Sequence, residues 1–327
     1  HKARPFVDAS NVITKGADSL AGRVIPFLWR RRMLARQLET DRVDLYHGIT
    51  NELPSGINKT KVKSVVSIAD LIFIRYPQLY YPADRLLYNY KFRKAARISD
   101  RIIAISQQTK NDIVEYFGIP DEKVDVVYLN CNSLFYSTVP EEQKSVIRNK
   151  FSLPSEYILY VSTIEPRKNL LNIIKAKHQY NLDIPVVAIG RQTDYAELVK
   201  KYIADHNIKN IYFLKNITNE ELPAIYQMAS VFVYPSTFEG FGLPILEALN
   251  SRIPVITSTG SCFHEVGGRS SIYVDPQNIE QLADAIRNVL NDQSLRQKMI
   301  DDGLAYASGF LPQRIAEGLM NVYRKIL

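Results

Sequence analysis

The feature that most constrains this chain is an alternation of short β-branched runs with amphipathic stretches along its whole length. Such alternation is typical of βαβ units, in which crossover helices join parallel strands. The runs predicted as strands are 43–47, 63–68, 101–105, 123–129, 157–162, 185–190, 211–214, 231–235, 253–257 and 271–274. Helical periodicity predicts helices at 107–117, 169–179, 194–206, 219–229, 278–291 and 312–326. We therefore expect an α/β protein.

A polar, proline-punctuated stretch at 135–157, with one short helix, separates the first four strands from the others. It predicts two Rossmann-like, doubly wound domains that face each other across a cleft, at 1–150 and 151–310. Residues 311–327 are predicted to form a final helix with an apolar face. Open α/β sheets bind ligands at the carboxyl ends of their strands, so the cleft is the expected site.

Composition indicates a soluble protein of the cytoplasm. The chain has 327 residues, 46% of them hydrophobic and 23% charged, which is ordinary for globular domains. No apolar run approaches the roughly 18 residues needed to cross a bilayer. Cys131 and Cys262 do not make a disulfide framework, and a reducing compartment is the default for so few cysteines.

The positive charge lies in the first half. Residues 1–150 carry 24 Lys and Arg against 16 Asp and Glu, whereas residues 151–327 carry 17 against 18. The excess includes Arg30, Arg31 and Arg32 and the cluster Lys91, Arg93, Lys94 and Arg97. Two interpretations stay open: a solvated face, or a surface that meets anionic lipid or a phosphate-bearing substrate. Nucleic acid is disfavoured, because no binding motif accompanies the charge.

Cations follow two strands of the second half. Arg167 and Lys168 precede a helix predicted to start near Asn169, where N–H groups, the helix dipole and full charges would together bind a diphosphate. The alternative is two exposed charges before a helix. Gly190 and Arg191 place a second glycine and cation at the end of the strand 185–190.

The segment "FEGFGLPILEAL" at 238–249 places Glu239 and Glu247 on either side of a tight entry into a helix. Pro244 suits the first turn, so we expect the helix to begin near Leu243, with Glu247 within that turn. Gly240 lets the backbone pass close to a ligand. We expect both carboxylates to face one small volume and to accept hydrogen bonds from sugar or ribose hydroxyls. The alternative for Glu247 is a carboxylate that only complements the helix dipole.

Taken together, these segments resemble a known family. "FEGFGLPILEAL" is similar to the paired-glutamate signature of the retaining GT-B glycosyltransferases, most closely glycosyltransferase family 4. "STIEPRKNL" and "IPVITSTGSCFHEVGG" resemble the segments on either side of that signature. "LYHGITNELP", "VSIADLIFIRYPQLYY" and "RIIAISQQTKNDIVEYFGIPDEKVDVVYLNCN" resemble the first domain of its bacterial mannosyltransferase-like members.

The resemblance implies a role for each matching residue. Glu239 would meet the hydroxyls of the donor sugar, Glu247 those of the ribose, and the base would lie near Asn216 and Ile217. The diphosphate would lie on Arg167 and Lys168, and the backbone from Gly240 through Phe241, Gly242 and Leu243 would hold sugar and phosphate. Transfer would retain the anomeric configuration without metal or other cofactor, which accords with the absence of an Asp-x-Asp pair in this sequence. His264 beside Glu265 is interpreted as loop structure. The resemblance also implies that the final helix, 311–327, packs its apolar face back on the first domain.

Two departures bear on catalysis. Relatives with this pattern usually read His-Asp-Leu, with the histidine near the reacting sugar, where this chain has Ala69, Asp70 and Leu71. Ala69 cannot donate a hydrogen bond, whether it is natural or introduced, and Asp70 stays a catalytic candidate. Nothing before Val43 reads as the family's opening strand and glycine-rich loop, so we expect at least one βα unit of the first domain to be missing.

The function implied is transfer of a hexose from a nucleoside-diphosphate sugar to a surface polysaccharide or lipid-diphosphate-linked glycan. GDP-mannose is the first choice of donor, and UDP-glucose or UDP-N-acetylglucosamine the second. The basic first domain would attach peripherally to the inner face of a bacterial inner membrane. Two alternatives remain: a nucleotide-sugar-binding protein without transferase activity, as Ala69 would indicate, and a GT-B sugar-nucleotide epimerase.

Overall fold

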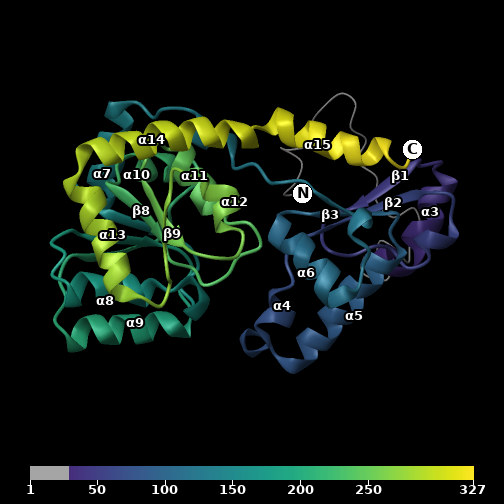
Figure 1. Ribbon diagram of the computed structural model, residues 1–327, viewed down its shortest axis with the longest axis horizontal. Helices are drawn as coiled ribbons and strands as arrows, with labels where there is room; N and C mark the ends of the chain where they lie inside the picture. Colours follow the sequence, from purple (N-terminus) through teal and green to yellow (C-terminus); the bar gives the residue numbers. More distant parts are fainter. Residues whose placement is uncertain (1–28) are drawn as a thin grey trace.

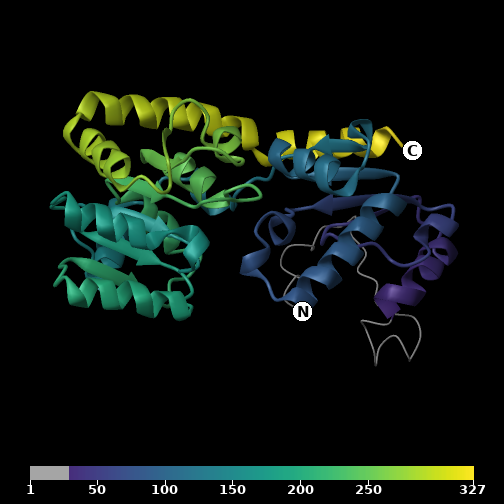
Figure 2. The same cartoon turned by 60° about the horizontal axis from the view of Figure 1, so that its bottom comes forward.

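The computed structural model describes residues 29–327, the side chains of Arg31 and Arg32 excepted, and has two lobes, each built on a parallel sheet (Figures 1 and 2). This confirms the predicted α/β class. The opening βα unit expected to be missing concerns the chain before Val43, much of which lies outside the described residues.

The smaller lobe holds a four-stranded sheet in the order β1-β2-β3-β4. Its strands are β1 (Leu45–Gly48), β2 (Lys63–Ile68), β3 (Arg101–Ala104) and β4 (Val124–Val126). The helices of this lobe are α3 (Leu34–Thr40), α4 (Ile72–Arg75), α5 (Pro82–Ile98) and α6 (Gln107–Phe117). Strands that are consecutive in the chain are neighbours in this sheet, so the strand order does not reverse.

The larger lobe holds a six-stranded sheet in the order β10-β9-β8-β5-β6-β7. Its strands are β5 (Ile158–Val161), β6 (Val186–Ile189), β7 (Ile211–Leu214), β8 (Val231–Tyr234), β9 (Val255–Ser258) and β10 (Ile272–Val274). Strands β5, β6 and β7 lie side by side in chain order. The chain then returns, and β8 pairs with the other edge of β5. The strand order reverses between β5 and β8, and such a switch point is where open α/β sheets bind ligands.

Helices cover both faces of the larger sheet (Figure 1). They are α7 (Glu141–Phe151), α8 (Leu170–Gln179), α9 (Asp194–Asp205), α10 (Leu222–Gln227), α11 (Leu243–Asn250), α12 (Phe263–Gly267), α13 (Ile279–Asn291) and α14 (Gln293–Ala307). One apolar core lies beneath α8 and α13, and a second beneath α10 and α11. Strands that are buried on both faces have nearly continuous apolar sequences, which is why these strands could be predicted from the sequence.

The final helix, α15 (Pro312–Arg324), crosses back to the smaller lobe (Figures 1 and 2). Val322 is buried against Val65 and Ile103 of the small sheet, with Ile315 and Leu319 packed beside it. The apolar face of the terminal stretch is therefore a packing face. The segment that joins the lobes belongs partly to the larger one. Ile147 of α7 packs in the core of the larger lobe, so the chain enters that lobe before residue 150.

Two long helices lay outside the predicted set, α5 and α14. Both lack a single clear apolar stripe: α5 carries leucines and tyrosines around much of its circumference, and α14 contains Gly303 and few large apolar residues. Among residues 29–327, no helix has the length and apolar character that crossing a bilayer requires.

Candidate active site

The loops after β5 and β8 meet, because these two strands are neighbours in the larger sheet. Arg167 and Lys168 end a short 3-10 helix, Pro166–Lys168, that follows β5. The loop after β8 is held against it by the N–H of Thr237, which donates to the carbonyl oxygen of Arg167 at 2.9 Å. Parallel pairing thus brings the predicted diphosphate cations to the predicted sugar loop.

Glu239 is the centre of the site, and its side chain is only 9% exposed. Its Oε1 accepts from Lys168 Nζ at 2.5 Å, from Ser236 Oγ at 2.6 Å and from Tyr234 at 2.9 Å. Arg167 lies 3.0 Å from the other oxygen. The carboxylate is therefore fixed in one orientation by two cations and two hydroxyls.

The charges of this cluster stabilise one another. Burial alone would raise the pKa of Glu239, but Lys168 and Arg167 outweigh it, and the net pKa lies below its ordinary value. Burial lowers the pKa of Lys168, and the carboxylate of Glu239 offsets part of that effect. We conclude that Glu239 is ionised at neutral pH.

Glu247 has different surroundings. One of its oxygens accepts from the hydroxyl of Tyr226, a fully buried residue of α10, at 2.9 Å. Burial raises the pKa of Glu247 and the hydrogen bond from Tyr226 lowers it in part. The prediction that α11 begins at Leu243 is confirmed, but Glu247 is its fifth residue and lies in the second turn, so its placement in the first turn was wrong. Side chains of a helix tilt toward its N-terminus, so the side chain of Glu247 is directed toward the start of α11.

Glycines make the close approaches of this site. A Cβ at Gly240 would lie 2.5 Å from the carbonyl oxygen of Ala69 in the smaller lobe. Gly242 has φ 94° and precedes α11, whose first N–H groups receive no side-chain cap. A Cβ at Gly190, where φ is 151°, would lie 1.8 Å from the carbonyl oxygen of Ser162. Only glycine fits these positions without movement of the backbone.

The smaller lobe contributes Ala69 and Asp70 at the end of β2. The N–H of Ala69 donates to Asn51 at 2.8 Å, and its carbonyl oxygen accepts from Thr109 Oγ1 at 3.0 Å. Asp70 accepts from the N–H of Ile72 at 3.0 Å. Asp70 lies against the sugar loop, because a Cβ at Gly240 would be 3.0 Å from the Cβ of Asp70. Burial raises the pKa of Asp70, while Arg167 and Lys168 of the larger lobe lower it.

Further contacts hold the two lobes together near the site. The carboxylate of Glu265 accepts from the N–H groups of Gln107 and Gln108, at 2.5 and 3.0 Å, which open helix α6 of the smaller lobe. On the other side, the Phe238 ring lies 5.3 Å from the guanidinium of Arg75. Phe238 of the sugar loop and Glu265 of α12 are therefore both in contact with the smaller lobe.

His264 was interpreted as loop structure. It lies instead in the short helix α12, with its ring stacked on Tyr273 at 3.7 Å between centroids. The stacking gives the ring a packing role. In residues 29–327 no three or more His, Cys, Asp and Glu side chains are grouped to hold a metal ion.

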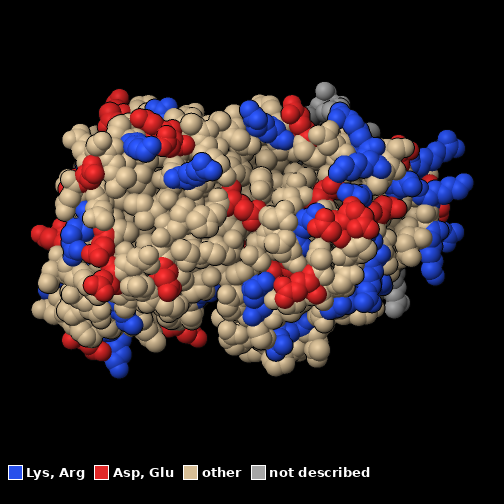
Figure 3. Space-filling view, viewed as in Figure 1, with Lys and Arg blue, Asp and Glu red and all other residues tan. Residues whose placement is uncertain are grey.

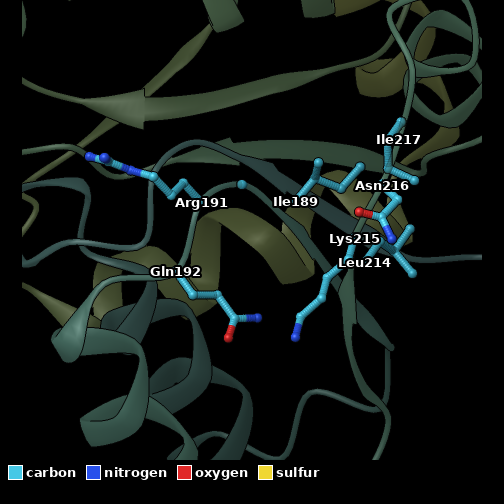
Figure 4. A pocket seen from close by; sticks show the side chains of 8 residues that line it. Ile189, Arg191, Gln192, Leu214, Lys215, Asn216 and Ile217 are labelled. Carbon is cyan, nitrogen blue, oxygen red and sulfur yellow. The ribbon is translucent and has the colours of Figure 1, made fainter.

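A pocket of about 430 Å³ opens at the carboxyl ends of β6 and β7 (Figure 4). It brings together the predicted pairs Gly190–Arg191 and Asn216–Ile217, with Gln192 and Lys215. In Figure 4 the side-chain ends of Gln192 and Lys215 point toward one another, whereas Arg191 extends away from them. Arg191 therefore lines this pocket mainly with its backbone, and the end of its side chain lies away from the pocket.

Sequence reasoning selected the charged members of the site and missed their partners. Tyr226 gives Glu247 its hydrogen bond, and Tyr234 and Ser236 give Glu239 two of its own. Tyr234 and Ser236 stand at the end of the apolar run of β8, and polar groups there were the available signal. Nothing local marks Tyr226, which lies 21 positions before its partner.

Comparison with known proteins gives consistent matches. The family model "Glycosyl transferases group 1" matches residues 142–305, and "Glycosyltransferase Family 4" matches residues 10–129. The O-antigen chain mannosyltransferase B of Escherichia coli is 28% identical over 342 residues, covering 98% of this chain and 88% of that protein. The O-antigen chain mannosyltransferase RfbU of Salmonella typhimurium is 29% identical over 65% of this chain and 61% of its own length.

Solved structures share the fold. A glycosyltransferase from Rickettsia africae has a TM-score of 0.75 at 19% identity, over 96% of this chain and 84% of its own. Anabaena HepE in complex with UDP-glucose has a TM-score of 0.73 at 18% identity, over 94% and 85%. At such identities the likeness shows the fold alone, and it establishes the predicted GT-B arrangement of two Rossmann-like lobes.

Proposed function

The chain belongs to the group 1 glycosyl transferase family, and on this premise we propose that it transfers a hexose from a nucleoside-diphosphate sugar to a growing surface polysaccharide. Two relatives are named as O-antigen chain mannosyltransferases, which supports mannose, from GDP-mannose, as the first choice. The complex of HepE with UDP-glucose keeps a UDP-hexose as the second.

The observation that carries the proposal is the cluster around Glu239. Lys168 and Arg167 are held at one carboxylate in a mostly buried site, next to the uncapped start of α11. A diphosphate placed there would contact both cations and the first N–H groups of the helix. Glu239, ionised and fixed by Tyr234 and Ser236, keeps lone pairs for the hydroxyls of the sugar.

Glu247 and the pocket would hold the nucleoside. One oxygen of Glu247 is taken by Tyr226, and the other has no hydrogen-bond partner among residues 29–327, so it is available to a ribose hydroxyl. The pocket beside Asn216 and Ile217 has room for a base. Its polar groups from Gln192 and Lys215 are suited to a base edge.

In the reaction, the bond between the anomeric carbon and the diphosphate oxygen breaks, and the electron pair leaves with the diphosphate. The acceptor oxygen adds on the same face and loses its proton, which gives retention. Arg167 and Lys168 would neutralise the charge that develops on the leaving diphosphate, a task that needs no metal ion here. Asp70 faces this volume from the opposite lobe, as a positioning or proton-accepting group.

The acceptor in this proposal is a glycan on a lipid-diphosphate carrier, at the inner face of a bacterial inner membrane. The excess of Lys and Arg in the first half supports it, because such charge favours anionic lipid and phosphate.

Thermal unfolding with GDP, UDP and ADP tests donor binding. A nucleotide at 100 times its dissociation constant stabilises a protein by about 2.7 kcal/mol, enough for a shift of several degrees. GDP alone should shift the midpoint of the intact protein, and Lys168→Ala and Glu247→Gln should each reduce the shift. A shift with UDP alone would remove GDP-mannose. If no nucleotide shifts the midpoint, the proposed donor site is wrong.

Turnover distinguishes the transferase from its two alternatives. Release of nucleoside diphosphate from the stabilising donor, dependent on bacterial membrane glycolipid, is the expected result. If the protein binds the donor but releases no nucleoside diphosphate, and Ala69→His restores that release, the protein is an impaired nucleotide-sugar-binding protein. Conversion of the donor in the absence of any acceptor would indicate an epimerase.

A further inference from the structure

Exposed large apolar side chains concentrate in one short segment of the smaller lobe. Thirteen such residues are exposed in the described chain, and five of them lie between positions 79 and 90. These five are Leu79, Tyr81, Leu86, Leu87 and Tyr90, which are 39%, 80%, 73%, 45% and 57% exposed. We call them the apolar patch. Scattered single apolar residues are normal on a surface, whereas a local concentration of them is typical of an interaction site.

Helix geometry places most of the patch on one face of α5. Leu86, Leu87 and Tyr90 are spaced i, i+1 and i+4, so they project together. The opposite face packs in the core of the lobe, where the Phe92 ring meets Phe73 at 5.3 Å between centroids. The helix is therefore apolar on both sides, and the stability of the lobe requires only the inner one.

Cations continue the same face toward the end of α5. Lys94 follows Tyr90 by one turn, with its Nζ 6.0 Å from the centre of that ring, and Arg97 follows in the next turn. Lys91 lies beside them in an ion pair with Glu52. Figure 3 shows many Lys and Arg side chains over this lobe, interspersed with groups of Asp and Glu, and a mostly uncharged tip below them. Apolar side chains followed by cations match the boundary between the acyl chains and the anionic headgroups of a bilayer.

The patch borders the site. The chain runs from Asp70 through α4 to Leu79, Tyr80 and Tyr81, and on this path the ring of Tyr76 lies 5.4 Å from that of Phe238 in the sugar loop, between centroids. Tyr80 itself packs against Phe73 at 6.4 Å. A bilayer that meets the patch would thus lie close to the candidate site.

We propose that the apolar patch and the cationic end of α5 form a membrane-docking surface for an anionic bilayer, which presents the cleft to an acceptor carried by a lipid. The membrane contact stands on this surface by itself. Only the identity of the acceptor rests on the proposed function.

Vesicle binding tests the surface without donor or acceptor. The full chain is sedimented with phosphatidylcholine vesicles, with or without 30% phosphatidylglycerol. We expect binding to the anionic vesicles, weakened about tenfold or more in Leu86→Gln/Tyr90→Gln and in Lys94→Gln/Arg97→Gln. Binding of the cation variant should lose its dependence on salt and on phosphatidylglycerol. Leu198→Gln, at an exposed leucine of α9 in the larger lobe, is the matched control and should bind like the unaltered protein.

The outcomes separate two failures. All variants should keep the unfolding midpoint and the nucleotide-induced shift, because the altered side chains are outside the donor site. Loss of vesicle binding in the control as well, or none in either double variant, overturns the docking surface. A dimer in solution that Leu86→Gln/Tyr90→Gln dissociates would assign the patch to a second copy and also overturn it. Vesicle binding without any nucleotide shift would leave the surface in place and refute the donor site.

Discussion

Replacing Gly240 by alanine should uncouple donor binding from transfer. The new Cβ would lie 2.5 Å from the carbonyl oxygen of Ala69 and 3.0 Å from the Cβ of Asp70. Both atoms belong to the backbone end of β2 or are fixed to it, so no flexible side chain can yield. The loop that carries Glu239 and the smaller lobe must move apart instead.

The size of the effect follows from these distances. Since Cβ atoms are not found closer than about 3.0 Å to another heavy atom, the separation must increase by at least about 0.5 Å. A misplacement of about 1 Å at a reacting centre costs on the order of 100-fold in rate. We expect kcat to fall by about tenfold to 100-fold. Nucleotide affinity should change by no more than about threefold, because that site lies within the larger lobe.

The assay is nucleotide release together with the nucleotide-induced shift of the unfolding midpoint. Gly309→Ala is the matched control, because a Cβ there has no heavy atom within 4 Å. It should keep both activity and affinity. Full turnover in Gly240→Ala at an unchanged midpoint would refute the reasoning, since the close approach of the two lobes would then not be needed for transfer.

Three other perturbations give distinct results. Tyr226→Phe removes the hydrogen bond to Glu247 and should cost about 1 kcal/mol in the free energy of unfolding, measured in urea, with several-fold weaker nucleotide binding. Glu239→Gln should destabilise the protein at neutral pH by about 3 kcal/mol, because it leaves Lys168 and Arg167 without their counter-charge. The pKa of Glu239 is lower in the folded protein than its ordinary 4.5, so its contribution is present above that value and is lost as pH falls below it. The difference between the two proteins should therefore shrink in acid, and a constant difference from pH 7 to pH 3 would contradict the ion-pair account. Glu265→Ala removes the acceptor at the start of α6 and should open the cleft, measured as a larger radius of gyration in solution scattering, with about 1 kcal/mol lost in stability. An unchanged radius would show that the remaining contacts suffice.

Much of this molecule could be predicted from local pattern. Short runs of β-branched and aromatic residues predict strands, and β2 and β7 were predicted to the residue on that basis. Helix α6 was too, because Ser106 caps its start and Gly118 ends it in the left-handed conformation. Helix α5 was not, since its outward leucines and tyrosines obscure the helical period.

The charged residues and glycines of the site could also be predicted, because glycines, cations and carboxylates at strand ends have few structural uses. Which of them meet was decided by the tertiary structure. Lys168 and Glu239 are 71 positions apart, and they pair because β8 returns to lie beside β5. Strand order depends on how whole helices pack across the sheet, a long-range property that no local run of residues encodes. The same packing placed Tyr226 under Glu247 and brought Ala69 against Gly240.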